Sequence, residues 1–402
     1  MSDRRNPALD GVRVIDLTDE HGAYAGRLLA LLGADVVRIE GREDATAPLL
    51  PPLHLSKSGP TSLFDEFVHS GKRSVRLDVT TEAGADVLER LVGQADVLLD
   101  AGHGRPPGGW VDVNPRLIHV TVTPLGYGRD PEPEPIDDLI VLGAGGLLHL
   151  GGYQDTGPIA PFGRQSHIAA GIFGAVAALA GLVEREQTGA GNAADVSAQE
   201  AVAQALEDSL PAYALTGKIR EPQGDEAREA GTGVYACQDG YVSMVAGRLG
   251  TARAWTALVE WINEREPSAR ELLEPQWGEF NFRQTTEASE TFRRIFEAFA
   301  ATRSKTELYV EAQERGIAMS PVSEIEDLLE SEQLRARSFF DGLDHPRLGT
   351  GLVIPGPPFR LSDSPSLTLG PAPVSGFDTA DVLTELGLTD EQIRQLGETE
   401  SV

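Results

Sequence analysis

The stretch PFGRQSHIAAGIFGAVAALAGLVEREQTGAGNAADVSAQEAVAQA, residues 161–205, decides the expected fold of this chain. From Ile168 onward, small and apolar residues recur at helical spacing, and the turn at 188–191 ends that helix. Residues 195–197 predict a short strand that leads into another helix. Glycine and alanine on one face of the long helix let neighbouring backbone approach closely. His167 stands at the beginning of this helix, where a polar side chain is well placed to meet a substrate.

The composition is typical of a globular protein with room for more than one domain. The 402 residues are 41% hydrophobic and 24% charged, which excludes a disordered chain. The longest apolar run, 168–183, contains glycines and is short for a bilayer span, so we expect a buried core helix and no membrane contact. No apolar signal segment is found at the N-terminus, and Cys237 is the single cysteine. These features predict a reducing, cytoplasmic location.

The net charge of −28 opposes binding of nucleic acid over the general surface. A small phosphorylated ligand would need a local pocket of Arg, Lys and backbone N–H groups. The sequence contains no metal-ligand spacing, P-loop or nucleophilic serine elbow. We therefore expect no metal and no nucleic-acid partner.

The N-terminal part alternates predicted strands and helices. Residues 11–17 and 34–40 have strand character, and 23–33 have helical periodicity between them. This βαβ beginning predicts a parallel sheet whose first loop could hold a phosphate at a helix N-terminus. The loop lacks a G-x-G-x-x-G pattern, so a nicotinamide dinucleotide is not expected. Residues 44–60, rich in Pro and Leu without a period, predict an irregular loop.

Several segments, taken in order, resemble the family III CoA transferases, whose relatives include the α-methylacyl-CoA racemases. Residues 16–40, DLTDEHGAYAGRLLALLGADVVRIE, are similar to the family's opening D-L-(S/T)…A-G-P-Y…L-G-A-D-V block. GKRSVRLD at 71–78 resembles N-K-R-S-x-x-L-D, and EREQTGAGNAADVS at 184–197 resembles the E-R-x-x-T-G-x-G-Q turn and its strand. The resemblance covers essentially the full length.

The resemblance implies an α/β fold: a large domain with a Rossmann-like parallel sheet, and a smaller α/β domain inserted into it. The expected limits are 1–212 for the first part of the large domain, 213–320 for the small domain and 321–402 for the return segment. The family also implies two chains threaded through each other as an interlocked dimer. We expect a homodimer, with a heterodimer containing a sister chain as the alternative.

The resemblance further implies that the ligand is CoA or an acyl-CoA. CoA would be part of the substrate, and no tightly bound cofactor is expected. The implied CoA-binding candidates are His21, Gly22, Ala23, Arg38, Lys72 and Arg73. Lys72 matches the family lysine that helps to bind the nucleotide, whereas a solvated strand edge is the alternative for Lys72 and Arg73. The family's E-N-F-x-P-G loop, which contacts CoA, is replaced at residues 100–104.

The family's catalytic carboxylate is missing from its usual place. Transferases have an Asp four positions before the helix glycine Gly171, and this chain has His167 there. In the family, that carboxylate attacks an acyl-CoA thioester, forms a mixed anhydride and then carries CoA. An imidazole cannot hold CoA as a thioester, so this route is closed at His167. The racemase branch has a His where this chain has Asp137, so the pair is exchanged; the neighbouring Asp138 is expected to cap a helix.

Three functions remain open at this stage. His167 and Asp137 could act as an acid/base pair that moves the α-proton of an acyl-CoA, as racemases do. The chain could instead transfer CoA by another residue or route. It could also be a binding subunit that pairs with a sister chain in which the Asp is present.

Overall fold

A computed structural model describes residues 6–41, 50–56, 59–102, 105–129, 136–222, 224, 229–246, 252–346, 348–365, 367–398 and 401–402. The chain divides into two compact units. The first consists of Met1–Gly151, Pro158–Glu221 and Leu334–Val402, and the second of Gly152–Gly157 and Pro222–Gln333. Both boundaries, at 222 and 334, lie later in the chain than the expected 213 and 321.

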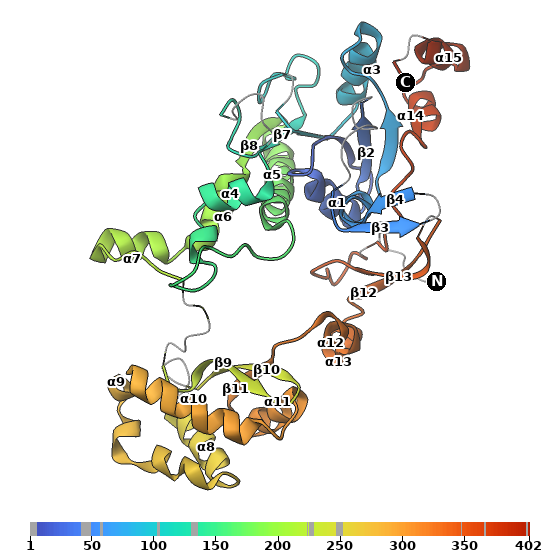
Figure 1. Ribbon diagram of the computed structural model, residues 1–402. Coiled ribbons are helices and arrows are strands. Elements are labelled where there is room, and N and C mark those ends of the chain that lie inside the picture. Colours follow the sequence, from blue (N-terminus) through green and yellow to red (C-terminus); the bar gives the residue numbers. More distant parts are fainter. Residues whose placement is uncertain are drawn as a thin grey trace. The chain divides into compact units, whose positions relative to one another are not determined.

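A parallel sheet forms the centre of the first unit (Figure 1). Its strands are β1 (Arg13–Leu17), β2 (Asp35–Glu40), β5 (Arg73–Arg76), β6 (Val97–Asp100), β7 (Ile118–Thr123) and β8 (Asn192–Ser197). The order is β5-β2-β1-β6-β7-β8, and every pairing is parallel. Because the chain proceeds outward in one direction from β1 and in the other from β6, a topological switch point lies between them. The predicted parallel α/β sheet is confirmed.

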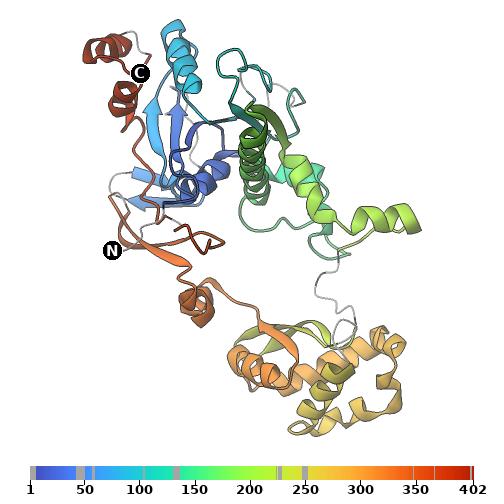
Figure 2. The ribbon, with the colours of Figure 1, turned by 180° about the vertical axis from the view of Figure 1, so that it is seen from behind.

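Helices cover both faces of this sheet. Val14 of β1 packs with α1 (Ala23–Leu31), α4 (Asp138–Ala144), α5 (Gln165–Thr188) and α6 (Ala198–Ala203). Its neighbour Ile15 points to the other face, against α3 (Glu82–Gly93), α14 (Thr379–Glu385) and α15 (Asp390–Glu398). Figure 2 shows the same layers from behind. Strands buried on both faces explain the continuous apolar runs of the sequence.

Glycines let α5 approach its neighbours closely. A Cβ added at Gly171 would lie 2.6 Å from Cβ of Tyr24 and 3.0 Å from the backbone nitrogen of Ala25, both on α1. One added at Gly181 would lie 2.6 Å from Cγ2 of Ile118 on β7. The predicted close approach at the small-residue face is confirmed.

The opposite face of α5 corrects the expectation of a fully buried helix. Four large apolar side chains are exposed on this helix within the chain: Ile172, Phe173, Val176 and Val183. Among the described residues, α5 alone has the length and apolarity of a possible bilayer span, with a mean hydropathy of 1.9. Core helices of water-soluble proteins meet the same criterion. The sequence pattern showed the apolarity of α5 but not which face stays exposed.

Further elements complete the first unit. Two hairpins are formed by β3 (Leu53–Ser56) with β4 (Gly59–Ser62) and by β12 (Phe340–His345) with β13 (Gly349–Pro355). The unit also contains the helices α2 (Leu63–His69) and α7 (Ser209–Thr216). Two short 3₁₀ helices are η2 (Leu148–Leu150) and η3 (Gln204–Leu206). The prediction of an irregular loop at 44–60 is therefore wrong for its second half, although 42–49 and 57–58 lie outside the described residues. The C-terminal segment joins the sheet, because the Ser74 N–H donates to Asp378 at 2.8 Å.

The second unit has its own sheet and core. Strands β9 (Thr232–Cys237), β10 (Gly240–Val245) and β11 (Ala318–Pro321) are antiparallel in the order β11-β10-β9. The helical segments are α8 (Ala252–Asn263), η4 (Pro267–Leu273), η5 (Pro275–Gly278), α9 (Phe280–Arg283), α10 (Thr286–Ala300), α11 (Lys305–Glu314) and α12 (Ile325–Glu330), while α13 (Glu332–Ala336) spans the boundary. Aromatic side chains such as Tyr235, Trp261 and Phe292 fill its core.

Candidate functional site

A cavity of about 630 Å³ lies at the carboxyl ends of β1 and β2. It is lined by Thr18, Asp19, Glu20, Arg38, Ile39, Glu40, Leu50, Pro60, Thr61, Ser62, Asp65, Glu66, Val68, His69, Ile136, Asp137, Arg164, Ala372, Pro373 and Ser375. All of these residues belong to the first unit. Open parallel sheets bind ligands at the carboxyl ends of strands, beside a switch point. The cavity is therefore the candidate functional site.

Two arginines supply positive charge to the cavity. Nη1 of Arg38 lies 3.6 Å from Oε1 of Glu40, and Nη1 of Arg164 donates to Oδ1 of Asp137 at 3.0 Å. Within the described chain these are the polar partners of the two guanidinium groups, so each retains N–H groups for another acceptor. Two guanidinium groups in a local pocket can hold an anionic ligand although the whole chain is strongly acidic.

His167 is fully buried in the first turn of α5. Its ring packs against the ring of His21, with centroids 4.2 Å apart, and against Phe64 at 6.1 Å. Neither ring nitrogen has a hydrogen-bond partner among the described residues. Burial, followed by the positive charges of His21 and Arg164, lowers the pKa of His167 to about 3. The imidazole is therefore neutral near neutral pH.

Asp137 does not contact His167 in this conformation. It is the N-cap of α4, where Oδ1 accepts the N–H of Asp138 at 2.7 Å and the bond from Arg164. Burial would raise its pKa, but these hydrogen bonds and the arginine charge lower it below the usual value. No hydrogen bond joins Asp137 to His167 in the described part of the chain. The acid/base role of this pair stays a prediction without a direct contact to support it.

The expectation that Asp138 caps this helix is wrong by one position. Asp137 has the extended backbone of an N-cap, and Asp138 is already helical. The buried Asp138 carboxylate instead accepts the N–H and the hydroxyl of Ser166 at 2.8 and 2.7 Å. This contact fixes the beginning of α5, and with it His167, against α4.

Lys72 is buried and fully hydrogen-bonded. Its ammonium group donates to Oδ2 of Asp16 at 2.7 Å and to the carbonyl of Ala23 at 2.8 Å, and lies 3.2 Å from Nδ1 of His69. Burial lowers the pKa of Lys72 more than the Asp16 carboxylate raises it. In this conformation Lys72 joins β1, α1 and α2, and it does not line the cavity. Its assignment to CoA stays a prediction.

The other predicted CoA-binding residues have different positions. Of the six, Arg38 alone is among the described residues that line the cavity. Arg73 pairs with Asp35 and Glu385. Gly22 is the N-cap of α1, where a Cβ would lie 2.4 Å from Cγ2 of Thr18. Gly22 borders the loop after β1, whereas the Asp35 partner of Arg73 lies at the amino end of β2, at the opposite edge of the sheet.

Asp19 and Arg164 are among the cavity residues to which the sequence gave no role. Asp19 follows the first strand of the sheet, and Arg164 directly precedes α5. Their positions beside the predicted first loop and the predicted catalytic helix were the available signals. The replaced CoA loop lies partly outside the described residues, at 103–104.

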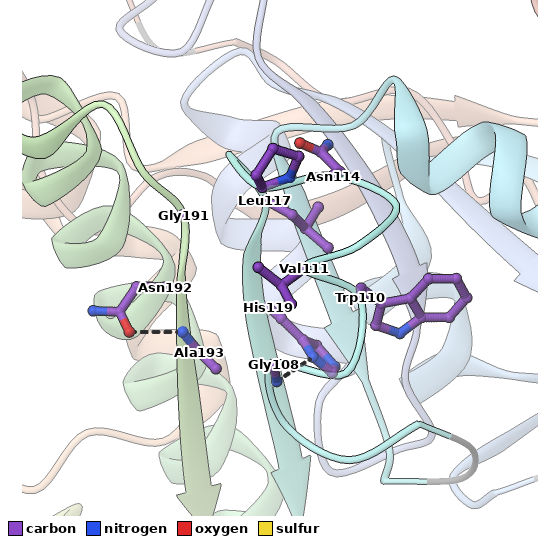
Figure 3. Close-up of a pocket in the computed structure, with 10 residues that line it drawn as sticks. Gly108, Trp110, Val111, Asn114, Leu117, His119, Gly191, Asn192 and Ala193 are labelled. Carbon is purple, nitrogen blue, oxygen red and sulfur yellow. Dashed lines mark hydrogen bonds between the residues drawn. The ribbon is translucent and has the colours of Figure 1, made fainter.

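A second cavity, of about 320 Å³, lies at the amino ends of β7 and β8 (Figure 3). His119 lines it, and its Nδ1 accepts the N–H of Gly108 at 3.2 Å while its Nε2 lies 3.2 Å from Asp100. His119 is therefore a hydrogen-bonded structural histidine. Because this cavity lies at the opposite strand ends, it is not the candidate site.

A doubly wound sheet with a guanidinium-lined cavity at its carboxyl edge is typical of α/β enzymes that bind anionic ligands. The profile of CoA-transferase family III matches residues 9–379. The chain belongs to this family.

Relatives and a solved structure agree with this assignment. The chain is 32% identical to the succinyl-CoA:(R)-benzylsuccinate CoA-transferase subunit BbsE of Thauera aromatica, over 96% of this chain and 95% of that protein. It is 29% identical to a formyl-CoA:oxalate CoA-transferase of Streptomyces avermitilis, over 97% and 98%. A crystal structure of a CaiB/BaiF family protein from Brucella suis has a similar fold, with a TM-score of 0.80 and 22% identity over 95% of this chain and 100% of that one.

Replacing Lys72 should cost stability. In Lys72→Met, the fully buried Asp16 carboxylate loses its counter-charge, so the free energy of unfolding should fall by about 3–5 kcal/mol. Arg73→Met is the matched control, because its partner Glu385 is 44% exposed and the loss should be about 1 kcal/mol or less. Urea unfolding measures both changes. Unchanged stability of Lys72→Met with weaker CoA binding would instead support the ligand-binding role.

The buried neutral imidazole should make stability depend on pH. The unfolded histidine titrates near about 6.5, and the folded one at about 3. Between these values the unfolded state binds more protons, so the free energy of unfolding falls as pH falls. Wild type should lose up to about 1.4 kcal/mol per pH unit more than His167→Leu in that window. Urea titrations between about pH 4 and 6.5 measure this slope; parallel slopes would show that His167 is not buried as described.

Proposed function

We propose that this chain binds the CoA thioester of an organic acid and transfers CoA to a second carboxylic acid. The observation that carries the proposal is the cavity at the carboxyl edge of the sheet, lined by Arg38 and Arg164, in a chain of CoA-transferase family III. The names of two relatives describe CoA transfer between acids. In this proposal the acyl group of the donor and the acceptor acid both bind in this cavity.

The two guanidinium groups suggest how the ligand is oriented. Arg38 lies on β2, and Arg164 lies three positions before His167. We place the phosphates of CoA toward Arg38 and the acyl group toward Arg164 and His167. Guanidinium groups bind phosphate and carboxylate with specific geometry, which suits the phosphates of CoA at Arg38 and the carboxylate of the free acid at Arg164. The transfer proceeds without a thioester at position 167, because an imidazole stands there.

Proton transfer at the α-carbon is the second candidate. One observation favours it: His167 is a buried imidazole in the neutral form that a general base requires, although a pKa of about 3 makes it a weak base. Its expected partner Asp137 is instead hydrogen-bonded to Arg164. The candidate therefore needs a rearrangement of Asp137 that CoA transfer does not need.

We further propose that a second copy of this chain covers the exposed apolar side of α5 and α7 in an interlocked dimer. The exposed apolar side chains there are Ile172, Phe173, Val176, Val183, Leu210, Tyr213 and Leu215. Apolar areas of this kind on a single chain mark association surfaces. A sister chain is the alternative occupant, since one relative is named as a subunit. We place the assembly in the cytoplasm.

Sedimentation velocity of the purified chain tests the assembly. A homodimer is expected, and Phe173→Glu should convert it to a smaller species because a charge at a buried apolar contact is costly. Gln187→Glu, an exposed change in the last turn of α5, is the matched control and should remain dimeric. A monomer that dimerises only with a related chain would favour the sister-subunit alternative.

The reaction should appear as exchange of CoA between acids. Purified chain is incubated in deuterated water with a panel of acyl-CoA thioesters and ¹³C-labelled free acids, and the thioesters are followed by mass spectrometry. We expect ¹³C-labelled acyl-CoA without deuterium at the α-carbon. Arg38→Ala should raise the KM for acyl-CoA about tenfold or more, because a charge-assisted phosphate contact is lost.

Each other outcome has its own meaning. Deuterium at the α-carbon without exchange would support proton transfer and contradict the proposed transfer. Retained CoA binding without either reaction would show that the chain is a binding subunit.

A further inference from the structure

The carboxylate of Asp19 is exposed to the cavity just beyond the end of β1. Its side chain is 33% exposed. Oδ1 accepts the backbone N–H of His21 at 2.9 Å and lies 3.4 Å from Nδ1 of the same residue. Oδ2 accepts no hydrogen bond from the described residues. One oxygen of a well-positioned carboxylate is thus available to a ligand.

Asp19 is close to the position where the family has its acidic residue. His21 links the two places, because it contacts Asp19 on one side and its ring lies 4.2 Å from the ring of His167 on the other. The electrostatic interaction between Asp19 and His167 also lowers the pKa of Asp19. A carboxylate on this loop can therefore meet a thioester that points toward the beginning of α5.

Two other cavity carboxylates are engaged by neighbours. Glu40 accepts the Ser74 hydroxyl at 2.6 Å, and Glu66 lies 2.6 Å from Nε2 of His345 in a buried pair. Glu66 and Glu40 are both buried, which leaves little of either to a ligand.

The other three carboxylic acids of the cavity, Glu20, Asp65 and Asp137, differ from Asp19 in the fraction that is ionised or in the exposure of the side chain. Burial raises the pKa of Glu20 and of Asp65, which reduces their carboxylate fraction. Burial would also raise the pKa of Asp19, but the hydrogen bonds and charge of His21 more than compensate. Asp137 is 66% exposed and ion-paired with Arg164. A reactive acyl intermediate is better protected from water at the less exposed Asp19.

We propose that Asp19 is the carboxylate nucleophile of CoA transfer in this chain, in place of the acidic residue that is missing at position 167. The proposal rests on the proposed function, and it assigns the group that does the chemistry. A carboxylate suits this work because it forms an anhydride with an acyl group and a thioester with CoA, and both are reversible.

The steps balance without a further reactant. Oδ2 of Asp19 bonds to the thioester carbonyl carbon, the C–S bond breaks, and CoA leaves as a thiolate with the electron pair. The thiolate then attacks Cγ of Asp19, the bond from Cγ to the bridging oxygen breaks, and the donor acid leaves as a carboxylate. The acceptor carboxylate next attacks Cγ and displaces the thiolate. Finally the thiolate attacks the acceptor's acyl carbon and releases Asp19 with one oxygen from the acceptor.

That oxygen provides a direct test. The full-length chain is incubated with an acyl-CoA thioester that it uses and with the matching free acid labelled with ¹⁸O. After trypsin digestion, fragmentation of the peptide 14–27 should place one ¹⁸O on Asp19 after a single transfer and up to two after repeated transfers. The measurement uses wild type, so it does not depend on a variant that folds.

Variants provide the second measurement. Asp19→Asn should retain CoA affinity and lose exchange by about 10³-fold or more, because an amide is not a comparable nucleophile. Asp86→Asn, at an exposed carboxylate on α3 outside the cavity, is the matched control and should retain the exchange.

The failures are distinguishable. An ¹⁸O label on Asp137 or elsewhere, or an Asp19→Asn variant that still exchanges CoA, would overturn the assignment of Asp19 and leave CoA transfer intact. Absence of exchange in wild type would overturn the proposed function itself, and the assignment with it.

Discussion

The ion pair between Lys72 and Asp16 is the constraint on which the candidate site depends. Both side chains are buried, and the ammonium group also binds the carbonyl of Ala23. A buried charge without its partner is costly, so each member requires the other. The pair fixes the end of β1 to the first turn of α1, and the loop that contains Asp19 runs between these two points. Gly26 makes room for the pair, since a Cβ there would lie 2.5 Å from Oδ2 of Asp16.

A second close approach positions the other half of the site. Gly171 brings α5 against Tyr24 and Ala25 of α1, so the beginning of α5 lies beside the loop after β1. His167 then meets the ring of His21. A larger residue at Gly171 would separate α5 from α1, because the packed backbone of Ala25 cannot yield as a flexible side chain can. The small-residue face of α5 thus determines the geometry of the site as well as the packing of the fold.

The sequence predicted those features that local pattern controls. Alternating apolar segments predicted the parallel sheet, and the glycine spacing predicted the close face of α5, because both depend on periodicity within one segment. Contacts between residues that are distant in the sequence could not be predicted from local pattern. Lys72 resembles a ligand-binding lysine in its own segment, and its burial follows from Asp16, which is distant in sequence. Asp137 and Asp138 are adjacent and chemically identical, so only the backbone angles show which one caps α4. The acid/base pairing of Asp137 with His167 stays a prediction, and Arg164, three positions before His167, donates a hydrogen bond to Asp137.

A carboxylate on the loop after β1 has properties that suit exchange between acids. The backbone carbonyl of Asp19 accepts N–H groups from Gly22 and Ala23, so the residue is held by the beginning of α1. With its pKa lowered, Asp19 is a weaker nucleophile than an ordinary carboxylate but a better leaving group from an anhydride. The donor and the acceptor are both organic acids of similar base strength, so Asp19 meets the same difference in leaving-group quality with each of them. Forward and reverse transfer then have comparable barriers, which an exchange enzyme needs.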